Sequence, residues 1–187
     1  MDKFIKLLES YTPISEQEAQ DKALISKFVE RHHDALSRTN LAGHVTSSII
    51  ILNSEKTHIL LGYHNIYGAW GWFGGHNDGD ADCYAVALKE VREETGLETF
   101  VKAPNDPIAL DVIYVQNHLK NGAYVPDHLH LNITYGFLAD DQIPLKVNAH
   151  EHQALRWFPL ETYLDEVDEV RMKPIYQKIV ERMLNQS

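Results

Sequence analysis

The sequence predicts an α/β (α+β) fold, an α/β/α sandwich preceded by a helical extension at the N-terminus. With 187 residues and 44% apolar content, the chain is long enough to bury one sizeable core. Runs rich in β-branched and aromatic residues alternate with segments of helical periodicity. We therefore expect residues 1–40 to pack as an extension on a main domain formed by residues 41–187.

Two helices are expected in the extension, over residues 1–11 and 15–35. The second begins with a Ser15-x-x-Glu18 capping box, in which each side chain satisfies a backbone N–H of the first turn. Apolar residues then follow at helical spacing: Ala19, Ala23, Leu24, Phe28 and Val29. This pattern predicts a helix with one face packed on the domain.

The first predicted strands, over residues 44–52 and 57–63, flank the polar segment 53–56 and read as a hairpin. An amphipathic helix follows at about residues 81–95. The remaining predicted elements are strands at 108–117 and 128–138, joined by a polar connection containing Asn121-Gly122, a strand near 153–158, and a final helix at about 167–184.

Three carboxylates lie on one face of the helix predicted at 81–95. Glu90, Glu93 and Glu94 are related as i, i+3 and i+4, so they fall within an arc of about 100°. Tyr84, Leu88, Val91 and Thr95 occupy the other, packed face. Like charges at this spacing cost a few tenths of a kcal/mol per pair, and acids in the last turn oppose the helix dipole at roughly 0.3–1 kcal/mol. A hard cation, Mg2+ or alternatively Mn2+, would offset that cost, whereas a solvated acidic face is the plainer alternative.

A Gly-rich loop, Trp70–Asp80, precedes this helix and can bring backbone groups close to a ligand. Together the loop and helix resemble the signature of the Nudix hydrolase family, which has MutT-like members. The residues in register are Gly75, Glu90, Val91, Glu93, Glu94, Gly96 and Leu97. Two positions differ, because Ala81 replaces the first signature Glu and Lys89 replaces the Arg.

The resemblance implies a mixed β-sheet between helices over about residues 40–185, and an Mg2+-dependent pyrophosphohydrolase. Its substrate would be a small nucleoside-diphosphate-linked compound, with water attacking phosphorus. The implied metal ligands are Glu90, Glu93, Glu94 and the carbonyl of Gly74 or Gly75. Glu151, in a loop before a Trp-Phe strand, is a candidate auxiliary ligand or base, and Glu90 is its rival as base.

The two departures from the signature leave alternatives open. Asp80 and Asp82 are candidate replacements for the carboxylate missing at Ala81. A non-catalytic Nudix-like module that binds a nucleotide or sugar nucleotide is the main competing function. An isopentenyl diphosphate isomerase shares the fold, but its cysteine lies upstream of the signature, whereas Cys83 lies inside it and is expected to be a small packed residue.

Polar side chains elsewhere are candidates for substrate binding. His128, His130 and Asn132 share one face of a predicted strand. That face either lines the substrate cleft or is simply a polar face of the sheet. A transition-metal site there is disfavoured, because the sequence has no carboxylate ligand between residues 130 and 139. The candidate substrate-binding residues are Arg38, His44, His64, Trp72, Gly75, His128 and His130.

Composition narrows the class of partner. A formal net charge of −10 disfavours broad binding to nucleic acid or anionic lipid, so we expect a small phosphorylated substrate, a nucleotide derivative. The single cysteine, the absence of an 18-residue apolar run and the lack of a signal-peptide pattern favour a cytoplasmic protein. A homodimer is expected by analogy with the family.

Overall fold

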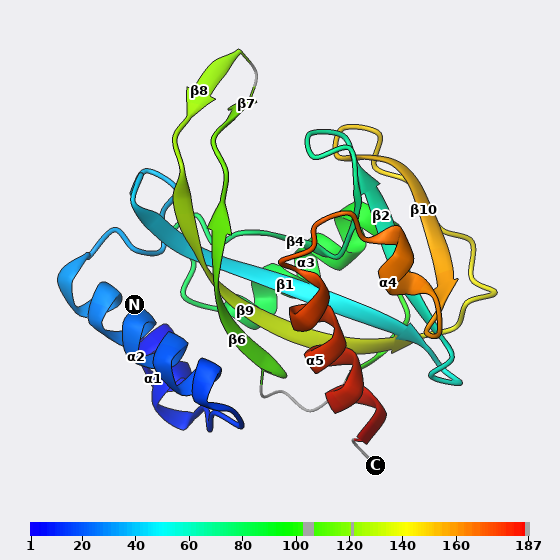
Figure 1. Ribbon diagram of the computed structural model, residues 1–187, viewed down its shortest axis with the longest axis horizontal. Helices are drawn as coiled ribbons and strands as arrows, with labels where there is room; N and C mark the ends of the chain where they lie inside the picture. The colour runs from blue at the N-terminus through cyan, green and yellow to red at the C-terminus, as the bar shows by residue number, and fades with distance from the viewer. Residues whose placement is uncertain (103–106, 121, 186–187) are drawn as a thin grey trace.

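A mixed eight-stranded sheet between two layers of helices forms the body of the computed structural model, which describes residues 1–102, 107–120 and 122–185 (Figure 1). The helices are α1 (Asp2–Ser10), α2 (Glu16–Arg31), α3 (Cys83–Thr95), α4 (Tyr163–Glu166) and α5 (Lys173–Asn185). The strands are β1 (Gly43–Asn53), β2 (His58–His64), β3 (Trp70–Gly71), β4 (Phe73–His76), β5 (Val101–Lys102), β6 (Ala109–Val115), β7 (His118–Lys120), β8 (Ala123–Val125), β9 (His128–Ala139) and β10 (His152–Pro159). The predicted α/β/α architecture is confirmed.

The sheet is built around β1 and β9, which pair in parallel along their whole lengths from Gly43↔Leu129 to Asn53↔Ala139. The main strand order is β10-β2-β1-β9-β5, with β3 on β2, β4 on β1 and β6 on β9. All pairings other than β1 with β9 are antiparallel. As predicted, β1 and β2 form a hairpin, and the Asn53 side-chain oxygen accepts hydrogen bonds from the N–H groups of Thr57 and His58.

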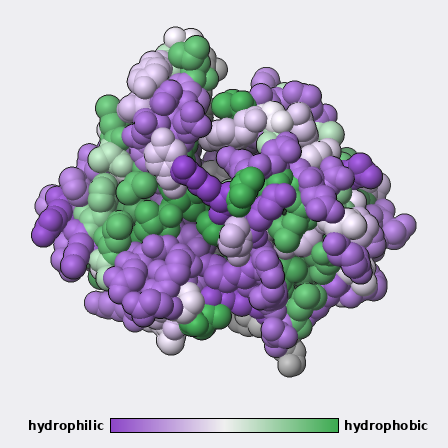
Figure 2. Space-filling view, in the orientation of Figure 1, coloured by the Kyte–Doolittle hydropathy of each residue, from purple (hydrophilic) through white to green (hydrophobic). Residues whose placement is uncertain are grey.

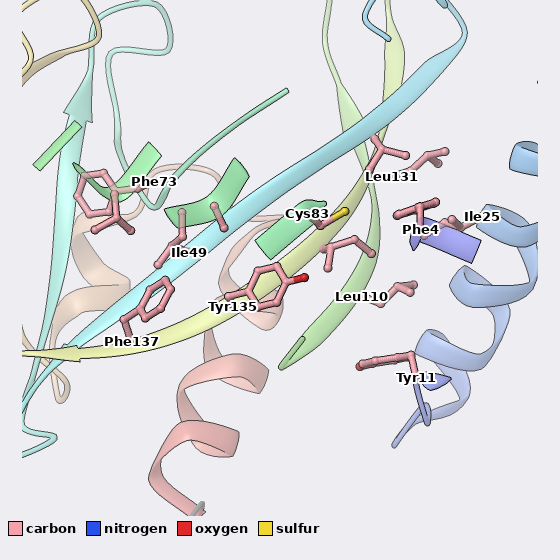
Figure 3. Close-up of a cluster of buried hydrophobic side chains, with 14 of the residues drawn as sticks. Phe4, Tyr11, Ile25, Ile49, Phe73, Cys83, Leu110, Leu131, Tyr135 and Phe137 are labelled. Carbon is pink, nitrogen blue, oxygen red and sulfur yellow. The ribbon is translucent and has the colours of Figure 1, made fainter. Parts of the chain in front are cut away.

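The two faces of the sheet carry two cores. Alternate residues of β1 such as Val45, Ile49 and Ile51 face α1, α2 and α3 in the larger core, part of which Figure 3 shows. Ile50 and Leu52 point the other way, into a smaller core with α4 and α5. All eleven residues of β1 are buried, because helices cover both faces of this central strand. None of the helices within the described residues is long and apolar enough to cross a membrane.

The N-terminal helices are tied to the rest of the chain through buried Glu18. Arg182 Nη1 lies 2.6 Å and Lys178 Nζ 3.1 Å from Glu18 Oε1, and the Tyr11 hydroxyl donates to its other oxygen at 2.8 Å. Only half of the predicted capping box forms. Ser15 accepts from the Glu18 N–H at 3.2 Å, whereas the Glu18 carboxylate accepts from the N–H of Ile14 at 3.2 Å and binds Arg182 and Lys178 of α5.

Three predicted boundaries shift for physical reasons. Helix α2 ends at Arg31, since residues 32–39 form turns in which the Ala35 carbonyl accepts from Val45 N–H and binds the extension to β1. Helix α5 begins at Lys173 rather than 167, because Pro174 is tolerated only in a first turn. The connection predicted between β6 and β9 instead contains the antiparallel pair β7–β8, an arm that projects from the body (Figure 1); Asn121 of the predicted Asn-Gly turn lies outside the described residues.

Candidate active site

Two glycines bring the β4 backbone against the acidic helix. Gly74 has φ +146°, and a Cβ there would collide with the Ser47 carbonyl of β1. A Cβ on Gly75 would overlap the Glu90 carboxylate. Only glycine therefore allows the strand and the carboxylate to approach this closely.

Helix α3 is capped at both ends by local contacts. The Asp82 carboxylate accepts from the Ala85 N–H at 3.2 Å and pairs with Lys3, while Asp80 accepts from the Asp82 N–H at 2.8 Å. Gly96 ends the helix in the left-handed conformation, φ +71°. Of the two aspartates considered as replacements for the carboxylate missing at Ala81, Asp82 thus caps the helix and Asp80 stabilises the preceding loop.

Glu94 is the most deeply buried acid of the helix, 2% exposed. Nε2 of His152 lies 3.2 Å from Oε2 of Glu94, and ligand atoms of Glu94, Glu151 and His152 all lie within 4.8 Å of one another. Burial and the neighbouring carboxylates of Glu151 and Glu90 raise the pKa of Glu94 well above its ordinary value. Gly62 makes room for this group, because a Cβ there would lie 2.6 Å from Nδ1 of His152.

Glu90 lies beside this group and is half-buried. Burial, followed by repulsion from Glu151, raises the pKa of Glu90 to about 7. A carboxyl group with a pKa near neutral suits proton transfer at physiological pH. The predicted rivals Glu90 and Glu151 are thus brought within electrostatic range of each other.

Glu93 differs from the other two helix acids because its side chain is 51% exposed. Its carboxylate lies 3.5 Å from Nζ of Lys89, one turn earlier on the helix. Lys89, which replaces the signature Arg, therefore interacts with an acid of its own helix. The three acids of this face differ in burial, from exposed Glu93 to half-buried Glu90 to buried Glu94.

Two predicted substrate-binding residues, Arg38 and His64, lie around this group, while Trp72 packs against the smaller core. Arg38 is exposed and forms a two-pronged pair with Asp78, within electrostatic range of Glu90 and Glu151. The His64 ring lies against His152, with centroids 5.5 Å apart. The Trp72 ring packs on Tyr176 of α5, and the backbone N–H of Trp72 donates to the Tyr176 hydroxyl at 2.7 Å.

The other predicted histidines form a separate cluster at the base of the β7–β8 arm. His44 and His130 are paired in the β1–β9 register, and His128 Nε2 lies 3.2 Å from His130 Nε2. His76, which sequence reasoning did not single out, joins them because β4 pairs with β1 at Thr46. Burial, followed by the neighbouring imidazoles, holds the pKa of His130 well below its ordinary value.

The strand face beyond the histidines continues as a closed polar network. The Asn132 side-chain oxygen accepts from Thr46 at 2.8 Å and from Ser48 at 2.7 Å, and its amide donates to Thr134 at 2.9 Å. These side chains are all buried. The face predicted from the His-x-His-x-Asn alternation thus combines an imidazole cluster with a satisfied network.

The acidic group fits a hard divalent cation by its donor chemistry. Glu90, Glu94 and Glu151 offer carboxylate oxygens beside the backbone of Gly74 and Gly75, which is the ligand type Mg2+ prefers. Among the residues that the structure describes, no lysine or arginine is bonded to any of the three. A group of buried acids without a bonded countercharge is suited to an added cation.

Comparison with known proteins places the chain in a family. A family model described as NUDIX domain matches residues 43–179. The chain belongs to the Nudix family. The predicted family and fold are confirmed, and the enzyme class predicted from that membership, a Nudix pyrophosphohydrolase, is confirmed with them.

Solved Nudix structures share the fold at low sequence identity. An Ap4A hydrolase from C. elegans, in a binary complex, is 17% identical with a TM-score of 0.57, covering 76% of this chain and 98% of that one. The E. coli dihydroneopterin triphosphate pyrophosphohydrolase is 13% identical, TM-score 0.56, covering 76% and 96%. A NUDIX family hydrolase from Clostridium perfringens is 17% identical, TM-score 0.52, covering 75% and 97%. A search of curated proteins found no significant match.

Proposed function

We propose that this Nudix protein is an Mg2+-dependent hydrolase that cleaves the diphosphate linkage of a small nucleoside-diphosphate-linked compound. The supporting observation is that Glu90, Glu94 and Glu151 lie close together beside the Gly74–Gly75 backbone. His152 contacts the Glu94 carboxylate. When bound, a divalent cation neutralises phosphate charge and lowers the pKa of a coordinated water.

We assign the cation to Glu94 and Glu151, whose oxygens already lie together, with a backbone carbonyl of Gly74 or Gly75. Glu93, exposed at the same end of the helix and within electrostatic range of Glu90, completes the ligand set. His152 holds the Glu94 carboxylate from its buried side.

Glu90 is assigned as the general base. Its raised pKa of about 7 lets it accept the proton of the attacking water near neutral pH. The water oxygen then bonds to phosphorus, and the bridging oxygen leaves with the other phosphate. Glu151, which contacts Glu94, acts as a ligand rather than as the base.

Substrate contacts are assigned to the residues around the acids. Arg38, within electrostatic range of Glu90 and Glu151, is placed to bind a substrate phosphate once it leaves Asp78. His64, which is in ring contact with His152 and Tyr67, is assigned to the wall of the substrate cleft. Trp72, which lies between β3 and β4 and packs against Tyr176 of α5, is assigned to it as well. His44, His128 and His130, which pack together at the base of the arm, are assigned to the other side of the cleft. Figure 2 shows the arm separated from the rest of this face by a notch.

The test is a hydrolysis screen with Mg2+, over dinucleoside polyphosphates, dihydroneopterin triphosphate, ADP-ribose, nucleotide sugars and nucleoside triphosphates. We expect Mg2+-dependent turnover of at least one compound, abolished by chelator and reduced at least a hundredfold in Glu90→Gln. If a compound binds tightly but its turnover equals that of Glu94→Gln, the protein is a binding module and the proposed function is wrong.

A further inference from the structure

We propose that His44, His76 and His130 form a second cation site, selective for a late first-row divalent metal such as Zn2+, separate from the carboxylate site. Ligand nitrogens of these three side chains all lie within 4.8 Å of one another. They come from the start of β1, the end of β4 and the start of β9. Three distant segments therefore place three imidazoles around one point.

The sheet register holds the three rings together. His44 lies opposite His130, and His76 lies opposite Thr46, two residues from His44 on the same face of β1. The ring centroids are 4.9 Å apart for His44 and His76, 5.1 Å for His44 and His130, and 5.2 Å for His76 and His130. The three rings are thus about equally spaced around one point.

The ring of His44 is oriented like that of a metal ligand. Its Nδ1 lies 3.1 Å from the Asn40 carbonyl, so Nδ1 carries the proton and Nε2 presents its lone pair. That Nε2 is buried and has no hydrogen-bond partner within the described residues, and His44 is 4% exposed. An unsatisfied buried acceptor is costly unless something binds it.

His128 supplies a fourth imidazole at contact distance. Its Nδ1 is bonded to the Pro126 carbonyl at 2.8 Å, which leaves Nε2 facing Nε2 of His130 at 3.2 Å. Two ring nitrogens at this distance need a proton between them or a cation beside them, because two lone pairs repel each other. His128 is therefore placed either to complete a tetrahedral site or to support His130.

The ligand type distinguishes this site from the acidic one. Neutral imidazole favours Zn2+, Cu2+ and Ni2+, whereas Mg2+ prefers oxygen ligands. Zinc–nitrogen bonds of about 2.0–2.1 Å separate neighbouring nitrogens by roughly 3.4 Å, so nitrogens that lie within 4.8 Å of one another need to close by at most about 1.4 Å. The nearby Arg38 is neutralised by its pair with Asp78 and does not leave an uncompensated positive charge.

The test is calorimetric titration of chelator-stripped protein with Zn2+ in excess Mg2+, which occupies carboxylates but competes poorly for imidazoles. We expect one Zn2+ per chain, with affinity at least thirtyfold weaker in His76→Asn and within twofold of wild type in His33→Asn, an exposed histidine outside the cluster. Zn2+ binding unaffected by His76→Asn, or no binding, would overturn the proposal.

A second measurement on the unaltered protein guards against a variant that does not fold. Crystals soaked in Zn2+ and measured at the zinc absorption edge should show an anomalous peak between His44, His76 and His130. A peak only at Glu94, Glu151 and His152 contradicts the second site but leaves the proposed hydrolase intact. Conversely, loss of Mg2+-dependent turnover leaves the zinc result standing.

Discussion

Two buried glutamates of this protein lie in opposite electrostatic surroundings. Glu18 of α2 is fully buried, and its carboxylate meets Arg182, Lys178 and Tyr11. Although burial by itself raises its pKa, the bonds from Arg182 and Tyr11 outweigh burial and hold the pKa below the ordinary value. Glu94 of α3 is 2% exposed and meets Glu151 and His152, and its pKa is raised well above the ordinary value.

The difference separates a structural acid from a functional one. The chain supplies the countercharge for Glu18, so the ion pairs join α2 to α5 without any ligand. For Glu94 the described residues supply no such countercharge but a second carboxylate, that of Glu151. The two carboxylates are stable in their ionised forms only with an added cation. The same substitution at the two positions should therefore have opposite consequences.

Glu94→Gln should have the largest effect on activity. The change keeps the shape of the side chain but removes a ligand charge, so kcat/KM should fall about 10³-fold, equivalent to about 4 kcal/mol. The melting temperature without metal should be equal to or above that of wild type, because a buried like-charge contact is lost. Turnover within threefold of wild type would remove Glu94 from the site.

Glu18→Gln should instead have its main effect on stability. Arg182 and Lys178 lose their buried partner charge, so the free energy of unfolding should fall by about 3 kcal/mol in denaturant titrations. Turnover per folded molecule, measured well below the melting temperature, should stay within threefold of wild type. A large loss of kcat in fully folded protein would contradict a purely structural role for this network.

Gly75→Ala tests whether catalysis requires the close approach of the β4 backbone to the Glu90 carboxylate. The added Cβ would displace the Glu90 carboxylate, so kcat should fall about thirtyfold, or about 2 kcal/mol. Gly71→Ala is the matched control, since its Cβ would lie 3.6 Å from the Tyr176 hydroxyl in ordinary contact. Equal activity of the two variants would show that Glu90 tolerates displacement.

The smallest effect is a pH dependence of stability in metal-free protein. The pKa of Glu90 is raised to about 7, and that of Glu94 is raised well above the same ordinary value of 4.5. Their contribution is fully present below pH 4.5 and is lost as pH rises through 7, because the folded state disfavours the charged forms. His44, His130 and His152, whose pKa values are lowered, contribute with the opposite sign. The loss is therefore measured as the difference from the double variant Glu90→Gln, Glu94→Gln. In thermal melts in chelator from pH 5 to 8 this difference should be about 1 kcal/mol, because solvent at half-buried Glu90 screens most of the roughly 3 kcal/mol that a rise in pKa from 4.5 to about 7 would supply.

Two additions control this experiment. Saturating Mg2+ should remove the loss, because a bound cation favours the charged carboxylates. The double variant Glu90→Gln, Glu94→Gln should lose this contribution in chelator and keep only the opposite slope of the buried histidines. The Glu18 group does not contribute in this range, since its pKa lies below 4.5 and its stabilisation is lost only at more acid pH. An unchanged slope in the double variant would assign the effect to other groups.

Local features of the fold could be predicted from sequence because each depends on neighbours in the chain. The Asn53 turn between β1 and β2, Gly96 at the end of α3 and the face shared by His128 and His130 follow from residue type and periodicity. The β7–β8 arm was not expected, since three-residue strands carry too little pattern to be distinguished from a polar connection.

The sequence by itself determined that three acids share one end of a helix beside a glycine pair, because helical periodicity places residues three and four apart on one side. Only the tertiary structure decided which acid is buried, that His152 contacts Glu94, and that His76 meets His44 and His130. Those outcomes depend on strand pairing and burial between distant segments. No local pattern encodes them, because burial and charge neighbours are properties of the packed chain.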